Sequence, residues 1–157
     1  MFDQSFALPP VTAVQDLEDL LSVRIAGDRY AIRTCEMSGL GSSPRITPVP
    51  SKVKGFLGVT AIRGVVTPVY CLAEFLGYGT DRDPVHWLSL FGTHEPVGLT
   101  FGSLEGYARI SRANLCVSKE TDGRQYVAEV ARIANLLYPI ISLASVAQTI
   151  KGKVNQV

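Results

Sequence analysis

The chain contains 157 residues, of which 46% are hydrophobic and 18% are charged, and its formal net charge is +1. This composition is typical of a globular protein, and a near-neutral chain without a Lys/Arg block argues against an electrostatic grip on nucleic acid or anionic lipid. We therefore expect any partner to be recognised by shape and apolar contact.

The first 19 residues are expected to form a flexible leader with at most one turn of helix, at residues 14–20. Asp3 and the pair Pro9–Pro10 do not fit a signal peptide. No segment approaches the ~20 apolar residues of a membrane-spanning helix. Three cysteines, an odd number, agree with free thiols in a reducing compartment. The protein is therefore expected to be cytoplasmic.

Alternating apolar and polar residues begin after the leader. Leu21, Val23 and Ile25 alternate with polar residues, and the pattern resumes at Tyr30 after a break at Gly27–Asp28. Two alternating runs around such a break predict a β-hairpin. The following residues 39–52 are rich in Gly, Ser and Pro, and this composition predicts an ordered loop.

The apolar stretch FLGVTAIRGVVTPVYCL, residues 56–72, contains a single charge. Its two halves, 56–62 and 65–71, have the length and β-branched content of strands. Arg63–Gly64 between them predicts a turn, because glycine adopts positive φ without steric cost. Pro68 predicts an edge position or a bulge in the second strand. The segment 72–77 predicts a short helix that ends at Gly77.

The second half of the chain continues with strand patterns. Residues 85–92 and 96–102 predict a second hairpin, 106–110 a further strand, and 118–125 an exposed loop. Residues 142–153 predict a helix with Ser142 as its N-cap and a basic end. The sequence shows no evident internal repeat.

The segment 126–137 is ambiguous, because Tyr126, Val130, Ile133 and Leu137 have helical spacing. Periodicity alone therefore favours a helix, and the residues themselves leave the alternative of a strand open.

Residues that could support catalysis are few. The chain has two histidines, His86 and His94, and its cysteines, Cys35, Cys71 and Cys116, all lie in strand-like runs. We interpret the thiols as small buried side chains, and we find neither the paired spacing of a zinc site nor a phosphate-binding loop. An enzyme that uses Cys71 or Cys116 with a histidine remains a disfavoured alternative. No cofactor or metal is expected.

The segment PRITPVPSKVKGFLGVTAIRGVVTPVYCLAEFLG, residues 44–77, resembles the central signature of the CheW family, the adaptors of bacterial chemotaxis arrays. Five elements of this segment follow the spacing of the family signature without a gap. They are Val49–Pro50, Gly58–Val59–Thr60, Ile62–Arg63–Gly64, Pro68–Val69 and the predicted helix that ends at Gly77. Weaker similarity extends over roughly residues 20–150, and it includes 20–32, 96–110 and 138–150.

The resemblance implies a mainly β fold of two five-stranded, SH3-like β-barrel subdomains with short helices. On this basis we expect one domain at 20–152, a tail at 153–157, and a strand at 126–133 that turns at Ala134–Asn135. The resemblance also implies a non-enzymatic adaptor that couples the signalling tip of a methyl-accepting chemoreceptor to the regulatory domain of a CheA-type histidine kinase, recruited through these partners to membrane-associated arrays.

Five residues match family positions assigned to partner binding or to the turns that support it. They are Arg63, which matches the signature arginine, Ile62 beside it, the turn glycines Gly58 and Gly64, and the apolar Met37. Several polar family positions differ, since Gly39, Ala61, Cys71 and Gly102 stand where the family carries acids or an amide. The alternative is a divergent adaptor of a twitching-motility or other chemosensory-like pathway that lacks one of the standard partners.

Overall fold

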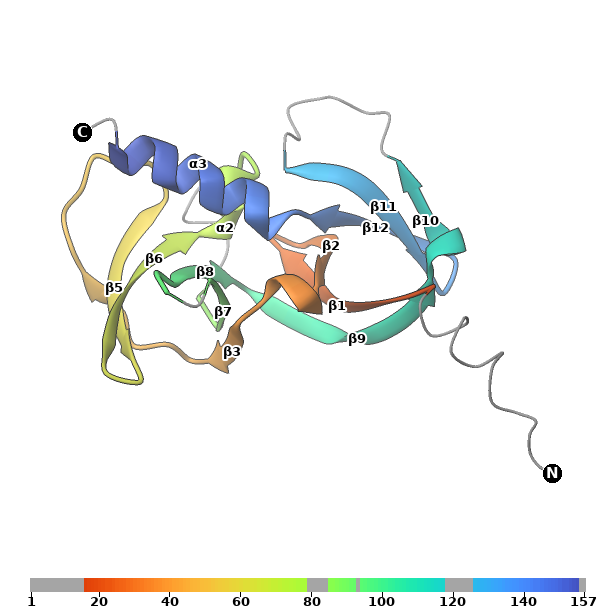
Figure 1. Ribbon diagram of the computed structural model, residues 1–157, viewed down its shortest axis with the longest axis horizontal. Helices are drawn as coiled ribbons and strands as arrows, with labels where there is room; N and C mark the ends of the chain where they lie inside the picture. The colour runs from red at the N-terminus through yellow and green to blue at the C-terminus, as the bar shows by residue number, and fades with distance from the viewer. Residues whose placement is uncertain (1–15, 79–84, 93, 118–125, 156–157) are drawn as a thin grey trace.

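The computed structural model describes residues 16–78, 85–92, 94–117 and 126–155, and these form two β-sheets joined by a common core (Figure 1). Sheet 1 has the order β3-β7-β8-β6-β5-β4 and sheet 2 has the order β9-β1-β2-β12-β11-β10. The bounds in sheet 1 are β3 Gly39–Ser42, β4 Thr47–Pro48, β5 Phe56–Ile62, β6 Val65–Cys71, β7 Trp87–Phe91 and β8 Val97–Phe101. Those in sheet 2 are β1 Leu17–Ile25, β2 Asp28–Arg33, β9 Ser103–Ser111, β10 Leu115–Val117, β11 Val127–Ile133 and β12 Leu136–Ile141.

The mainly β fold with short helices is confirmed, although each sheet has six strands where five were expected. The additional pairing in sheet 1 comes from the two-residue β4, which pairs with β5 through Thr47 and Pro48. The helices in the described part of the chain are η1 Thr34–Glu36, α2 Leu72–Phe75, η3 Arg112–Asn114 and α3 Leu143–Asn155.

The two sheets repeat one topology. In each, the neighbours are antiparallel except for one parallel pair, β6 with β8 in sheet 1 and β12 with β2 in sheet 2. The hairpin β5–β6 followed by α2 corresponds to β11–β12 followed by α3, and a register shift occurs at the same place in both hairpins. Sheet 1 is continuous in sequence, whereas β1 and β2 complete sheet 2 from the other end of the chain.

The sequence carries a trace of this repeat, which was not predicted. Ile62-Arg63-Gly64-Val65-Val66-Thr67-Pro68 aligns without a gap to Ile133-Ala134-Asn135-Leu136-Leu137-Tyr138-Pro139. Both turns have positive φ at their two central residues, 53° and 78° in the first and 51° and 66° in the second. Ile62 and Pro68 recur as Ile133 and Pro139, whereas the five residues between them differ, so the repeat is clearer in backbone geometry than in residue identity.

The hairpins predicted from turn chemistry are confirmed. β5 pairs with β6 around Arg63–Gly64, and β7 pairs with β8. β1 pairs with β2 around Ala26–Gly27, one residue earlier than the predicted break at Gly27–Asp28. The predicted strand at 126–133 is also confirmed as β11. Helical spacing in this segment is therefore misleading.

Pro68 lies in β6, which is an interior strand of sheet 1. The parallel ladder between β6 and β8 begins only at Val69, so Pro68 stands on a stretch of β6 that is flanked by β5 alone. The missing N–H of proline therefore removes no bond to β8, which reconciles the predicted edge position with an interior strand.

Three predicted boundaries are corrected. β1 begins at Leu17, so residues 17–20 are strand rather than leader or helix, and α3 extends to Asn155 into the predicted tail. The predicted loop 39–52 contains β3 and β4. The predicted loop 118–125 lies outside the described residues, as does most of the leader.

The shared core lies between the sheets. Side chains from sheet 2, such as Ile25 and Ile32, pack with Leu99 and Phe101 of sheet 1 and with Leu72 of α2. α3 follows β12 of sheet 2 but lies over sheet 1 (Figure 1), and its buried Leu143, Val146 and Ile150 belong to the same core. The Ser142 hydroxyl accepts a hydrogen bond from the Ser145 N–H at 3.2 Å, as predicted for an N-cap. The two sheets and α3 thus form one packed unit.

Candidate functional site: a groove beside the Arg63 turn

The turn between β5 and β6 presents Arg63 to solvent. Arg63 and Gly64 both have positive φ, a combination that fits a tight two-residue hairpin turn, and Ile62 pairs with Val65 to close it. The next residue, Val66, is 69% exposed. The hairpin tip therefore combines a cation with exposed apolar surface.

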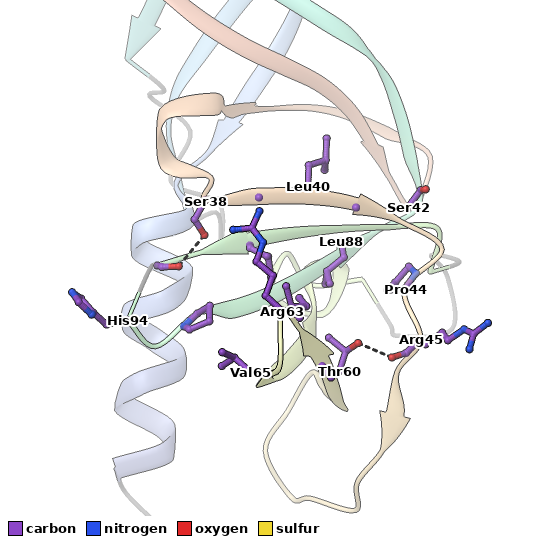
Figure 2. A pocket seen from close by; sticks show the side chains of 17 residues that line it. Ser38, Leu40, Ser42, Pro44, Arg45, Thr60, Arg63, Val65, Leu88 and His94 are labelled. Carbon is purple, nitrogen blue, oxygen red and sulfur yellow. Dashed lines mark hydrogen bonds between the residues drawn. The ribbon is translucent and has the colours of Figure 1, made fainter.

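A groove of about 640 Å³ lies beside this turn (Figure 2). We call it the Arg63 groove. Its lining comes from β3, from the tip of the β5–β6 hairpin, from β7 and from the β7–β8 connection. The lining residues are Ser38, Gly39, Leu40, Gly41, Ser42, Pro44, Arg45, Thr60, Ala61, Ile62, Arg63, Val65, Leu88, Leu90, Gly92, His94 and Pro96.

The lining of the Arg63 groove is mainly apolar and carries no carboxylate. Its ionisable side chains are Arg45, Arg63 and His94, all exposed. In Figure 2 Arg63 reaches from the hairpin toward β3, while His94 and Arg45 lie on opposite sides of the view. The groove therefore favours a ligand that presents apolar groups and negative charge.

The repeat explains why a groove forms in sheet 1. The interior of sheet 2 holds a packed cluster that includes Leu20, Ala131 and Tyr138. By the strand registers, the corresponding positions of sheet 1 are Leu88, Thr60 and Thr67. Thr67 has a smaller side chain than Tyr138, but Thr67 is fully buried and is not among the residues that line the Arg63 groove.

Strand length contributes to the same difference. β9 in sheet 2 has nine residues, and with β10 it supplies Ile110 and Leu115 to the packed cluster. Its counterpart β3 has four residues, and Gly41 takes the place of Ala108. The Arg63 groove is therefore the part of the sheet 1 interior that the side chains of this protein leave unfilled.

The structure places the five predicted site residues in three locations. Arg63 and Ile62 line the Arg63 groove, and Gly64 lies in the exposed turn beside it. Gly58 is buried, and a Cβ atom there would lie 2.1 Å from the Thr47 carbonyl oxygen, which gives this glycine a structural reason. Met37 is half-buried against the shared core and does not line the groove.

β3, Arg45 and His94 were not predicted as parts of a site. β3 has the sequence Gly-Leu-Gly-Ser, which is too short and too poor in apolar residues to give a period-two signal. No pattern around Arg45 or His94 could have indicated that they lie at one groove, because the sheet brings them together from three separate segments.

The cysteines do not support a catalytic site. Cys71 is buried as predicted, but Cys35 and Cys116 are exposed, which corrects the expectation of buried thiols. Cys35 lies in η1 and Cys116 in β10, a strand at the end of sheet 2, where a side chain can face solvent. Within the described ranges, no three His, Cys, Asp or Glu side chains are grouped so that they could hold a metal ion.

Cys71 is the N-cap residue of α2, where its side chain forms no capping hydrogen bond. The equivalent position before α3 is Ser142, which does cap its helix.

None of the helices in the described part of the chain is long and apolar enough to cross a bilayer.

Comparison with known proteins agrees with this architecture. The family model described as CheW-like domain matches residues 19–151. The crystal structure of the scaffolding protein TtCheW from Thermoanaerobacter tengcongensis superposes with a TM-score of 0.70 at 16% sequence identity, over 79% of this chain and 88% of that chain. A search of curated proteins found no match. Because the family model spans most of the chain, the protein belongs to the CheW-like domain family.

Proposed function

We propose that the protein is a non-enzymatic adaptor that couples the signalling tip of a methyl-accepting chemoreceptor to the regulatory domain of a CheA-type histidine kinase. The observation that carries the proposal is the position of Arg63, exposed at a hairpin tip and on the rim of an acid-free apolar groove, in a chain of the CheW-like family. The role implies a cytoplasmic protein that reaches membrane-associated arrays through its partners.

The surface near Arg63 supports protein binding. Leu40, Val65 and Val66 are exposed there, at 40%, 49% and 69% of their surface. Burial of such side chains contributes about 25 cal/mol per Å² before the ordering of the partner is counted. The cation beside them supplies orientation and selects an acidic partner surface.

A second candidate is an adaptor of a twitching-motility or other chemosensory-like pathway, with one standard partner lost. It is favoured by one observation: Ala61, which stands where the resemblance has an asparagine, lines the Arg63 groove. The apolar methyl group removes both a hydrogen-bond donor and an acceptor from that wall.

Two separate pull-down assays with the full chain test the proposal. One uses a soluble receptor signalling tip as bait and the other uses a kinase regulatory domain. The adaptor role predicts retention by both baits, and retention by one bait alone supports the second candidate. Retention by neither bait rejects both.

A further inference from the structure

We propose that the Arg63 groove accepts an extended, acidic segment of a partner protein, which adds as a strand to the free edge of β3. The inference adds a binding mode to the proposed adaptor role. It rests on that role because it assumes that the partner is a protein. Three features of the described residues support it: a strand edge without a partner strand, unfilled apolar space, and two arginines with no carboxylate in the lining of the groove.

The strand edge belongs to β3. Among the residues that the structure describes, this strand is the last in sheet 1 and pairs with β7 alone, through the register Gly39–Leu90 to Ser42–Trp87. All four residues of β3 line the groove, so the groove follows the strand along its length. An edge strand leaves the N–H and C=O groups of alternate residues unpaired, and an extended peptide can bind to them.

The apolar space lies next to this edge. Leu88 and Leu90 of β7 and Ile62 and Val65 of the β5–β6 hairpin line the groove that β3 borders. In sheet 2 the corresponding interior is closed by the longer β9 and by side chains such as Tyr138. A peptide strand with an apolar side chain at every second position would supply the missing side chains to sheet 1.

The charge selects the remaining side chains of the segment. Arg63 and Arg45 carry the positive charge beside the groove, and no carboxylate is found among the described residues that line it. A segment that alternates apolar and acidic residues satisfies both requirements, because successive side chains of a strand point to opposite faces. A lysine-containing segment would meet like charge.

The probe for this inference is a fluorescein-labelled ten-residue peptide of alternating glutamate and valine, titrated with the full-length protein and followed by fluorescence anisotropy. We expect saturable binding, and at least about tenfold weaker binding of the peptide with lysine in place of glutamate. Absence of binding at about 1 mM protein, or equal binding of the two peptides, would overturn the inference.

Backbone recognition is tested with two N-methylated peptides. One carries N-methyl groups on the valines and the other on the glutamates, and both keep every side chain. Because an edge strand exchanges hydrogen bonds with alternate residues only, one peptide should lose about tenfold or more in affinity while the other binds normally. Equal affinities of the two methylated peptides would contradict strand addition.

The site is tested with a substitution in β3. A Cβ atom at Gly41 would meet nothing within 4 Å, and its φ is not positive, so Gly41→Leu places a side chain in the groove without strain in the fold. We expect about tenfold weaker peptide binding at an unchanged Tm. The matched control is Gly106→Leu in β9 of sheet 2, where the nearest contact is the Ser22 Oγ atom at 3.6 Å. If the two substitutions changed peptide affinity equally, the peptide would not bind at β3, and the inference would be overturned.

A negative result in the peptide assays and a negative result in the pull-down assays reject different proposals. Peptide binding that depends on Gly41, together with no retention by receptor or kinase, would reject the proposed function but keep an acidic-strand site. Retention by both baits that Gly41→Leu leaves unchanged, together with no peptide binding, would reject only the present inference. Blockage of the groove by a second copy of the chain would appear as concentration-dependent sedimentation that Gly41→Leu removes, and this too would overturn the inference.

Discussion

The side chain of Glu36 lies at the N-terminus of α3, where its Oε1 accepts a hydrogen bond from the backbone N–H of Leu143 at 3.4 Å. Its Oε2 accepts another from Ala144 at the same distance. Glu36 ends η1, the short helix between β2 and β3, and thus lies where the chain passes from sheet 2 to sheet 1. One carboxylate therefore connects this crossing to the helix that covers sheet 1.

Glu36→Ala should lower the free energy of unfolding by about 1 kcal/mol, because two N–H groups of the first turn lose their acceptor and the helix dipole loses a negative partner. Glu36→Gln keeps one oxygen acceptor and loses the charge, so a smaller decrease is expected. Urea denaturation followed by circular dichroism measures both values. A decrease for Glu36→Gln as large as that for Glu36→Ala would assign the effect to charge alone.

Gly58 and Gly64 both match family positions but should respond differently to substitution. Gly58 has a φ of 150° and its Cβ would collide with the Thr47 carbonyl, whereas Gly64 has a φ of 78° with open space around it. Gly58→Ala should therefore cost more than about 2 kcal/mol, through strain and loss of the β4–β5 pairing, and Gly64→Ala about 1 kcal/mol. Thermal unfolding of the two variants compares them, and equal Tm values would contradict the prediction.

Arg63→Glu should leave the fold intact, because the side chain is exposed at a turn. Binding to an acidic partner should weaken by about tenfold or more, since the substitution reverses the charge on the groove rim. Co-sedimentation with receptor tip and kinase measures the effect. Arg132→Glu in β11 is a matched control, since this arginine is also exposed but lies in the equivalent hairpin of sheet 2. Unchanged co-sedimentation of the Arg63→Glu variant would show that Arg63 does not contribute to partner binding.

Asp19 should give stability a weak dependence on acidic pH. Its carboxylate accepts hydrogen bonds from Arg109 Nε and Tyr107 Oη, both at 2.7 Å, and these bonds lower the pKa of Asp19. A lowered pKa in the folded state means that the contribution is fully present above the unfolded value of about 3.9 and is lost as pH falls through the folded value.

The difference in unfolding free energy between the parent chain and Asp19→Asn should therefore be constant from neutral pH down to about pH 4 and disappear below it. Urea titrations at a series of pH values measure this difference. A difference that grows as the pH falls would have the wrong sign and would contradict the assignment.

The sequence predicted the hairpins well because their signals are local. Arg63–Gly64 and Ala26–Gly27 are turns whose chemistry is contained in two residues and their alternating flanks. The strand β11 is different, since its residues satisfy helical spacing and only the family resemblance indicated a strand. Its conformation is set by pairing with β10 and β12, which periodicity within one segment cannot represent.

The candidate site was predicted only in part. Arg63 and Ile62 were found through the family motif, but the groove beside them depends on the shortness of β3 and on Gly41 at the position where sheet 2 has Ala108. These are differences in length and volume between segments far apart in the chain. The repeat itself was missed because sheet 2 is assembled from both ends of the chain and so has no continuous copy in the sequence.

This division of the chain has a consequence for folding during synthesis. Every strand of sheet 1 lies between residues 39 and 101, so its pairings can form as soon as that stretch has left the ribosome. Sheet 2 must wait, because β2 finds its parallel partner only when β12 emerges more than a hundred residues later. Until then β1 and β2 form a hairpin whose outer edge is available to other chains. We therefore expect truncations before β12 to leave sheet 1 the more protected part of the nascent protein in hydrogen exchange.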